Sequence, residues 1–429
     1  ITRTGLDDVI VPKANSALVF AVDSSGNQIW NYSFGATTHA NRPALGDFDR
    51  DGIIDDVAYL HDDTTDVVVA LNRTGQQIWN TSLDVALSFS KATLGDIDRN
   101  GYINDYVVAA GDGAKLYVLN GTGSIVWTYV HPSGYDLVDV AVGDFNRSGY
   151  KDSVAFLANE DAASNNNVIL FVMDKNGNHL WNVTLTTTSG RHKAFSPITM
   201  KVADINNDGY DDIVASDSNT NIYGYNNSGS QLWSITTPGL GTGTAAPAAI
   251  EVGDFDNDKL IDDVAYAPYV DQTPYPTVYI NNSGEQIRNV SAGQTNEPSV
   301  LIAFDYDNDG LFNELLFRGN SNTFSSIFNE TGEVVKSISK ITTEYSAGVG
   351  DLDNDGFEDD AVMSINSEII AYNSAGSVLW NFTKDNSNVL PLVELPVGDF
   401  DADFSGCMIK FTDRKTYDFM RFDKLNNSI

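Results

Sequence analysis

The acidic residues of this chain have types and spacing suited to binding a hard cation. In the stretch GDFDRDGIIDDV, aspartates occupy positions 1, 3, 5 and 9 of a short loop: Asp47, Asp49, Asp51 and Asp55. Gly52 at position 6 permits a sharp turn, so the backbone carbonyl of Ile53 at position 7 can join the carboxylates. Ca²⁺ accepts about six to eight oxygen ligands at flexible geometry. The loop therefore predicts a calcium site.

This loop pattern recurs along the whole chain. Related stretches begin at intervals of 49, 48, 60, 50, 51, 46 and 48 residues, at Asp96, Asp144, Asp204, Asp254, Asp305, Asp351 and Asp399. A fixed period in this range is typical of solenoids, propellers and arrays. One acidic loop would be a weak signal, because such turns are common at protein surfaces. Several well-matched copies of the loop at a regular spacing indicate a repetitive domain.

The elements that hold these loops are strands. The first loop is followed by the apolar run DVAYL (residues 56–60), which is typical of a short strand. The loop is not an EF-hand, because flanking helical patterns and a glutamate at position 12 are both missing. We therefore expect each acidic loop to join the first and second strands of its unit.

A strand, a glycine hairpin and a tryptophan repeat with the same period, as in VVALNRTGQQIWNTS. All six tryptophans stand at this one position of the repeat: Trp30, Trp79, Trp127, Trp181, Trp233 and Trp380. Arg288 and Lys336 replace tryptophan in two other units. We expect an outer strand that packs its indole against the neighbouring unit.

These features predict an all-β fold, a β-propeller with blades of four antiparallel strands. Eight blades are predicted, with seven blades and frayed ends as the alternative. Residues 1–429 should form one domain. The N-terminal unit (residues 5–34) lacks an inner strand, and the only unpartnered inner strand lies at residues 393–399. Pairing the two would close the ring, although residues 406–423 still resemble two further strands.

Composition narrows the class of protein. The hydrophobic content of 42% is ample for a core, and the net charge of −34 argues against nucleic acid or anionic membrane as a partner. Seven Ca²⁺ ions would reduce that charge to about −20. A salt-rich habitat is the competing explanation for the acidity. No apolar run is long enough to span a membrane. The chain begins with Ile1, so we expect a processed or trimmed product.

The acidic loops resemble those of FG-GAP repeats, also called VCBS repeats, which occur in integrin α chains. The hairpin half, as in ALNRTGQQIW, resembles the quinoprotein-type repeat of eight-bladed propellers. The FG-GAP resemblance implies Ca²⁺ between the first two strands of a blade, in an extracellular propeller used for adhesion or ligand binding. It specifies no ligand, and nothing in the sequence marks a quinone pocket.

The resemblance carries calcium-ligand roles onto positions 1, 3, 5 and 9 of seven loops. Besides the first loop, three sets match well: Asp204, Asn206, Asp208 and Asp212; Asp254, Asp256, Asp258 and Asp262; and Asp351, Asp353, Asp355 and Asp359. Three sets have fewer charges: Asp305, Asp307, Asp309 and Asn313; Asp96, Asp98, Asn100 and Asn104; and Asp144, Asn146, Ser148 and Asp152. Lys259 replaces the glycine in one loop. The loop at Asp399 should be empty, because Cys407 is a soft ligand.

Candidate catalytic residues are few. The histidines are scattered, with no pair at metal-ligand spacing: His39, His61, His131, His179 and His192. The face opposite the acidic loops should carry the irregular insertions at residues 158–168, 186–197 and 267–277, with Arg191, Lys193, Phe195, Tyr269, Tyr275 and Tyr345. Loops on a rigid scaffold are common recognition sites, and tolerated loops without function are an equal alternative.

Glycosylation sequons share the period of the repeat. Five follow the tryptophan position: Asn31, Asn80, Asn182, Asn289 and Asn381. Five lie in the hairpins: Asn72, Asn120, Asn226, Asn281 and Asn329. Their clustering on the rim predicts glycans on an extracellular or cell-surface protein, while Asn146 should stay bare in its metal loop.

Two function classes follow. The first is a calcium-stabilised, non-catalytic surface scaffold or adhesion module that binds surface proteins, glycans or copies of itself. The second is a propeller-fold polysaccharide lyase or hydrolase. An enzyme should cluster acid and base residues around the central channel, whereas a scaffold should present flat complementary surfaces. The sequence leaves both open.

Overall fold

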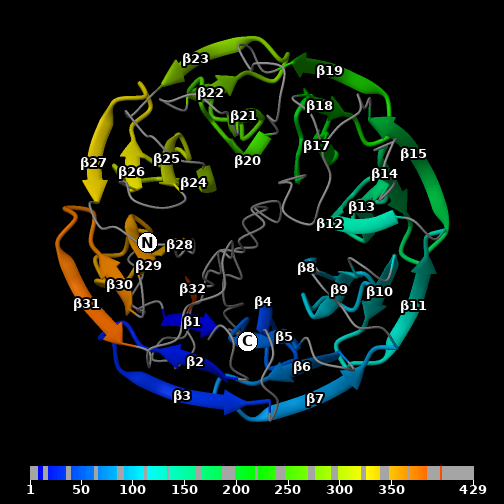
Figure 1. Ribbon diagram of the computed structural model, residues 1–429, viewed down its shortest axis with the longest axis horizontal. Coiled ribbons are helices and arrows are strands. Elements are labelled where there is room, and N and C mark those ends of the chain that lie inside the picture. Colours follow the sequence, from blue (N-terminus) through cyan, green and yellow to red (C-terminus); the bar gives the residue numbers. More distant parts are fainter. Residues whose placement is uncertain are drawn as a thin grey trace, which may run out of the picture.

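A computed structural model describes residues 8–12, 18–34, 40–61, 66–84, 91–110, 114–132, 135–160, 167–185, 199–217, 221–236, 247–268, 276–290, 298–319, 325–338, 347–365, 368–383 and 397–398. Within these ranges all elements are strands, arranged as eight four-stranded antiparallel sheets. The sheets stand side by side in a ring (Figure 1). The protein is an eight-bladed β-propeller, so the seven-bladed alternative is wrong.

From the inside outwards, the strands of blades 2 to 4 follow chain order, whereas blade 1 has β32 inside β1. Blade 1 contains β32 (Val397–Gly398), β1 (Asp8–Pro12), β2 (Leu18–Val22) and β3 (Gln28–Ser33). Blade 2 contains β4 (Ala40–Gly46), β5 (Asp56–His61), β6 (Val67–Leu71) and β7 (Gln77–Ser82). Blade 3 contains β8 (Lys91–Gly95), β9 (Asp105–Ala110), β10 (Lys115–Leu119) and β11 (Ile125–Val130). Blade 4 contains β12 (Tyr135–Gly143), β13 (Ser153–Glu160), β14 (Val168–Met173) and β15 (His179–Leu185).

Blades 5 to 8 repeat this order. Blade 5 contains β16 (Met200–Ala203), β17 (Asp212–Ser216), β18 (Asn221–Tyr225) and β19 (Gln231–Thr236). Blade 6 contains β20 (Pro247–Gly253), β21 (Asp263–Pro268), β22 (Thr277–Ile280) and β23 (Gln286–Val290). Blade 7 contains β24 (Pro298–Phe304), β25 (Glu314–Gly319), β26 (Ser325–Phe328) and β27 (Val334–Ile338). Blade 8 contains β28 (Ala347–Gly350), β29 (Asp360–Ile365), β30 (Glu368–Tyr372) and β31 (Val378–Thr383).

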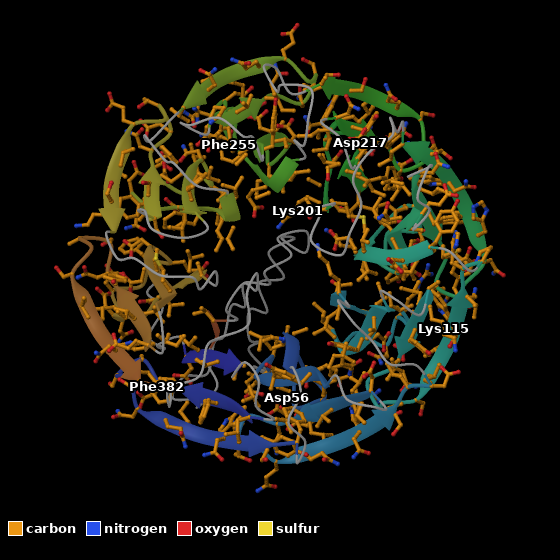
Figure 2. All side chains as sticks on the ribbon, viewed as in Figure 1. Asp56, Lys115, Lys201, Asp217, Phe255 and Phe382 are labelled. Atoms are coloured by element: carbon orange, nitrogen blue, oxygen red, sulfur yellow. The ribbon has the colours of Figure 1, made fainter. Side chains whose placement is uncertain are left out.

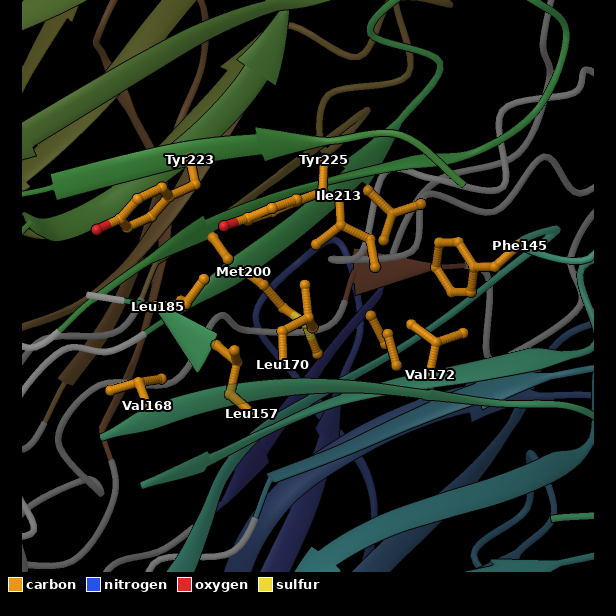
Figure 3. Close-up of a cluster of buried hydrophobic side chains, with 14 residues drawn as sticks. Phe145, Leu157, Val168, Leu170, Val172, Leu185, Met200, Ile213, Tyr223 and Tyr225 are labelled. Atoms are coloured by element: carbon orange, nitrogen blue, oxygen red, sulfur yellow. The ribbon is translucent and has the colours of Figure 1, made fainter. Parts of the chain in front are cut away.

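The hydrophobic cores lie between neighbouring blades. In Figure 3, Leu157, Leu170 and Val172 of blade 4 face Met200 and Ile213 of blade 5. Both faces of a blade are covered in this way, so the middle strands are continuous apolar runs. The outermost strands alternate, as in the exposed and buried positions of β19. Fully burying a side chain of this size is worth about 1.5–3 kcal/mol, so blade contacts stabilise the ring.

The indole of each of five tryptophans lies on the hairpin of the next blade. Their Nε1 groups donate to hairpin carbonyls at 2.6–2.9 Å, as Trp30 does to Arg73. A Cβ added at Gly75 would lie 2.8 Å from the Trp30 ring, so this close approach requires glycine. Lys336 replaces the indole with an ammonium that donates to Ala375 at 2.5 Å. The contact agrees with the packing expected for the repeat.

The inner strands lie nearest the centre of the ring (Figure 1). Lys201 on β16 lies toward the middle of the ring, whereas Lys115 and Phe382 lie toward its outside (Figure 2). Two ion pairs join neighbouring inner strands: Lys201 Nζ lies 3.2 Å from Glu251, and Lys91 Nζ lies 3.0 Å from Asp139. All four side chains are largely withdrawn from solvent. These pairs link blade 5 to blade 6 and blade 3 to blade 4.

Blade 1 is built from both ends of the described chain. Its inner strand β32 pairs with β1 through Asp8 with Gly398 and Val9 with Val397. Trp380 of blade 8 lies against Gly26 of blade 1, and its buried Nε1 has no hydrogen-bond partner in the described part of the chain. Residues 406–423, which resembled further strands, lie outside the described residues.

Candidate metal sites

Seven acidic loops join the first strand of a blade to its second. Because the strands are antiparallel, these loops and the hairpins between third and fourth strands lie on the same face of the ring. Contacts between the two confirm this in blades 5 and 8. The backbone N–H of Asn227 donates to Asp212 at 2.9 Å, and that of Ser374 donates to Asp360 at 3.1 Å.

One turn geometry is common to all seven loops. The carboxylate at position 1 accepts a hydrogen bond of 2.8–3.1 Å from the backbone N–H at position 6, as Asp47 does from Gly52. Position 6 has a positive φ in every loop, which glycine adopts freely. Lys259 takes the same conformation with φ 76°, so the missing glycine does not change the turn. The lysine backbone is instead strained in this left-handed conformation.

The carboxylate that closes the loop differs from the sequence expectation. The structure places position 10 against the loop backbone: Asp56 Oδ2 accepts from the N–H of Asp49 at 2.7 Å. Asp105, Asp212 and Asp263 accept from the position-3 N–H in the same way, whereas Glu314 and Asp360 accept from the N–H at position 2. Strand register sets this position, because the closing residue pairs with the residue before position 1. Asp212 was identified because its loop is one residue shorter.

The side chains at position 9 reach the preceding blade in five of the loops. Asn104 Nδ2 donates to the Asp47 carbonyl at 3.0 Å, and Asp152 lies 2.5 Å from Arg99 Nε. Asp262, Asn313 and Asp359 bond at 2.6–2.9 Å to Asn207, Asn257 and Asn308, which stand at position 4 of the preceding loop. Asp55 lies 3.6 Å from Arg73 of its own blade. Position 9 therefore couples each of these five loops to its neighbour.

Several closing carboxylates are buried without a full set of donors. One oxygen of each of Asp56, Asp105, Asp263 and Glu314 has no hydrogen-bond partner among the described residues, and neither has Asp47 Oδ1. Burial, reinforced by the other loop carboxylates, raises the pKa of Asp56, Asp263 and Glu314 to about 8. It raises the pKa of Asp105 to about 7. A cation bound among these oxygens would supply the missing partner and lower these pKa values.

Carboxylate oxygens converge in the loops of blades 2, 3, 6 and 7. In each of these loops, three acidic side chains offer atoms within 4.8 Å of one another: Asp47, Asp49 and Asp51; Asp96, Asp98 and Asp105; Asp254, Asp256 and Asp258; and Asp305, Asp307 and Asp309. This spacing suits an oxygen-ligated cation. Position 10 was not selected from the sequence. The signal for it is an acidic residue directly before the apolar run of the second strand.

The loop of blade 4 supplies its own donors. Asp144 accepts from the backbone N–H groups of Ser148 and Gly149 at 2.8 Å. Asp152 accepts from Arg99, and the Ser148 hydroxyl lies 3.3 Å from it. Ser153 stands where other blades have a closing carboxylate, since it pairs with Gly143. This loop therefore differs from the others in having serines at positions 5 and 10 and an arginine of the preceding blade paired with position 9.

The two sets of sequons differ in their surroundings. In the hairpins, the asparagine Oδ1 accepts from two backbone N–H groups, as Asn72 does from Thr74 and Gln76 at 3.1 and 2.9 Å. Asp23 and Asp174 make the same bonds at this position, so turn chemistry explains an Asn or Asp there. The outer-strand asparagines are all exposed: Asn31, Asn80, Asn182, Asn289 and Asn381.

Other residues considered from the sequence are distributed as follows. His131 is buried among Tyr129, Tyr135 and Phe171, and burial lowers its pKa. It is part of a core. A further group lies outside the described residues: His39, Arg191, His192, Lys193, Phe195, Tyr269, Tyr275, Tyr345, Asp399 and Cys407. Among the described residues, no helix is long and apolar enough to cross a membrane.

Comparisons with known proteins support the repeat and the fold. The family model of an FG-GAP-like repeat matches residues 204–264, which contain the acidic loops of blades 5 and 6. No curated protein sequence matches the chain. The structure is similar to Sqt1 from Saccharomyces cerevisiae, at 12% identity and a TM-score of 0.56, over 81% of this chain and 86% of that one.

Two bacterial structures are also similar. BamB from Moraxella catarrhalis matches at 14% identity and a TM-score of 0.51, over 86% of this chain and 94% of that one. Rhamnogalacturonan lyase PL11 from Bacillus licheniformis matches at 15% identity and a TM-score of 0.50, over 94% of this chain and 75% of that one. At such identities the likeness concerns the fold alone. Residues 204–264 thus match an FG-GAP-like repeat, and they lie in a ring of eight four-stranded blades.

Proposed function

We propose that this protein is an extracellular, calcium-stabilised propeller that serves as a rigid, non-catalytic binding scaffold. The observation that carries the proposal is a set of buried carboxylate oxygens that have no hydrogen-bond partner among the described residues, at Asp47, Asp56, Asp105, Asp263 and Glu314. A buried carboxylate that lacks a donor costs free energy unless a cation or a proton compensates it. Carboxylates alone, without thiolate or imidazole, favour Ca²⁺ over transition metals.

Six loops have side chains that fit calcium. Each would use positions 1, 3 and 5, the carbonyl at position 7 and the closing carboxylate. The closing carboxylates are Asp56, Asp105, Asp212, Asp263, Glu314 and Asp360. The loop of blade 4 is left out of the proposal, because Ser148 and Ser153 replace two carboxylates and Arg99 pairs with Asp152. Bound calcium would hold the inner strand to the second strand at the position where charge repulsion otherwise separates them.

Calcium in one loop should also order the next loop. The position-4 to position-9 contacts run from loop to loop, as from Asn207 to Asp262 and from Asn308 to Asp359. A stack of similar units is stabilised by the sum of local and nearest-neighbour interactions. Fixing the loops would therefore stiffen a whole face of the ring, which is a property of a scaffold.

The proposed location and partners rest on the surface. Exposed sequon asparagines on the outer strands suit glycans on an extracellular protein. The partners proposed are other surface proteins, glycans or further copies of this chain. They would bind the face opposite the acidic loops, because the connections on that face vary most in length, from two residues between β29 and β30 to fourteen between β15 and β16, and loops on rigid scaffolds commonly recognise ligands.

Calcium removal tests the proposal directly. Ligand at about 100 times its dissociation constant stabilises a folded protein by about 2.7 kcal/mol per site. Several sites together should raise the melting temperature by roughly 10 °C or more. We therefore expect the melting temperature to fall by that amount when a chelator removes calcium. Magnesium should replace calcium poorly. Metal analysis must verify removal. An unchanged melting temperature in verified metal-free protein would overturn the calcium role.

A further inference from the structure

We propose that blade 7 binds a second divalent cation, held by Asp307, Glu314 and Glu330, beside the ion in its acidic loop. The inference rests on the proposed calcium-binding function and adds a site that the repeat pattern does not contain. Glu330 lies in the hairpin between β26 and β27, whereas the other two residues belong to the β24–β25 loop and its closing position. The site therefore joins two separate connections of one blade.

Geometry separates two groups of oxygens in this blade. Asp305, Asp307 and Asp309 form one group, with an atom of each within 4.8 Å of the others. Asp307, Glu314 and Glu330 form another group under the same limit. Asp307 belongs to both, and a carboxylate has two oxygens with which to bridge neighbouring ions. The pattern suits two adjacent cations that share Asp307 and the closing carboxylate Glu314.

The second group contains a buried oxygen that the protein leaves without a donor. Glu314 is 1% exposed, and its Oε2 accepts from the backbone N–H of Tyr306 at 2.9 Å. Its Oε1 is buried and has no hydrogen-bond partner among the described residues. An acidic side chain in that setting requires a positive partner or a proton. The neighbouring Asp307 and Glu330 are themselves acidic, so they do not supply one.

Other blades show what this hairpin position normally contributes. In blade 2 it is Arg73, whose guanidinium lies 3.6 Å from Asp55. In blade 6 it is Asn282, whose Nδ2 donates to Asp262 at 2.8 Å. In blades 5 and 8 its backbone N–H donates to the closing carboxylate. The position thus delivers a cation or a donor to the loop, but in blade 7 it delivers a carboxylate. A bound cation resolves that reversal.

A neighbouring arginine makes its own contacts in blade 6. Arg288 of blade 6 donates from Nη1 to the Phe255 carbonyl at 2.9 Å, and its guanidinium lies 4.3 Å from the centre of the Tyr279 ring. It interacts with Glu330 electrostatically. Five carboxylates gather in blade 7, at Asp305, Asp307, Asp309, Glu314 and Glu330. One divalent ion leaves an excess of three negative charges, whereas two ions leave one.

The test counts bound Ca²⁺ in the full chain by calorimetry and by native mass spectrometry. Glu330→Gln should bind one ion fewer than the wild type and keep the others. Glu333→Gln is the matched control, because Glu333 is exposed in the same hairpin and carries the same charge. Glu330→Lys should also lose one ion, and its ammonium should preserve folding. In crystals of the wild-type protein grown with calcium, anomalous scattering should show two peaks in blade 7.

Each other outcome has a defined meaning. An unchanged ion count in Glu330→Gln overturns the second site, even if calcium binds more weakly, because Glu330 would then serve the loop ion. A single anomalous peak in blade 7 also overturns it. If Ca²⁺ binds to the other loops in either case, the proposed function survives. If the wild type binds no Ca²⁺ at all, the proposed function and the second site fail together.

Discussion

The loops of blades 4 and 7 have one backbone geometry and opposite electrostatics. In both, the position-6 N–H bonds the first aspartate, Gly149 to Asp144 and Gly310 to Asp305. Around the blade 4 loop stand the Ser148 hydroxyl and the Arg99 guanidinium. Around the blade 7 loop stand four further carboxylates. The turn is therefore specified by its glycine and first aspartate, while cation binding depends on the surrounding side chains.

The largest difference should appear when calcium is removed. Hydrogen exchange at the amide of Gly310 should accelerate about 100-fold in a chelator, because a site saturated at about 100 times its dissociation constant contributes that factor. Exchange at Gly149 should change by less than about threefold, since its loop retains protein donors. Mass spectrometry of loop peptides measures both. Equal acceleration in the two loops would show that the contrast between them is not about metal.

A reciprocal change should convert blade 4. The double substitution Ser148→Asp with Ser153→Asp supplies position 5 and the closing carboxylate, so this loop should gain one Ca²⁺. Without calcium it should lose about 3 kcal/mol of unfolding free energy, because buried charge is left uncompensated. Titration calorimetry and denaturant unfolding measure these effects. The double change to asparagine is the control and should gain no ion. A variant with two aspartates that stays empty would contradict the ligand assignment.

Metal-free protein should become less stable as pH rises. The pKa of Glu314 is about 8 in the folded chain, above its usual value of about 4.5, because burial disfavours the charge. A group with a raised folded pKa contributes its stability fully below the unfolded pKa and loses it as pH rises through the folded one. Melting temperatures in chelator should therefore fall by several degrees between about pH 5 and about pH 9, a range that runs from near the unfolded pKa to above the folded one.

Calcium supplies the control for this pH dependence. Saturating Ca²⁺ should abolish most of the fall, since the ion stabilises the charged carboxylates. Glu314→Gln should reduce the slope in chelator, because it removes one group whose pKa is raised. If stability in chelator instead rises across this range, the closing carboxylates have protein partners after all, and the difference between blades 4 and 7 is smaller than the geometry indicates.

The smallest effect concerns the turn alone. Lys259 adopts φ 76° where other loops have glycine, and a non-glycine residue in this conformation costs about 1 kcal/mol. Lys259→Gly should therefore stabilise the protein by about that amount, equally with and without calcium. Denaturant unfolding in both conditions measures it, with Gly310→Lys as the opposite change. A gain seen only with calcium would mean that the lysine charge, not its backbone, is responsible.

The ring could be predicted from the sequence because two independent features, the acidic loops and the tryptophan hairpins, recur with the same period. The sequence also identified positions 1, 3, 5 and 6, which lie within a single turn. It did not identify Asp56 as the closing residue, because that role depends on pairing with Gly46 across two strands. Counting along the chain selects Asp55 instead.

Contacts between connections were beyond the reach of spacing arguments. Glu330 belongs to the hairpin of blade 7, and only the fold brings it to Asp307 and Glu314. The link from position 4 to position 9 crosses between blades, as Asn257 does to Asn313. Sequence separation in both cases is set by strand and loop lengths, so no local pattern records these neighbours.

The pairing of β32 with β1 has a mechanical consequence. Asp8 begins β1 and Gly398 ends β32, and the two are partners, so the chain enters and leaves blade 1 at the same edge. A pull on both ends there loads the pairs one after another instead of all together in shear. Between blades 8 and 1, the Trp380 indole has no acceptor among the described residues, so it adds less resistance than the other five. Under tension the disc should open along this line first, with the other blades still folded.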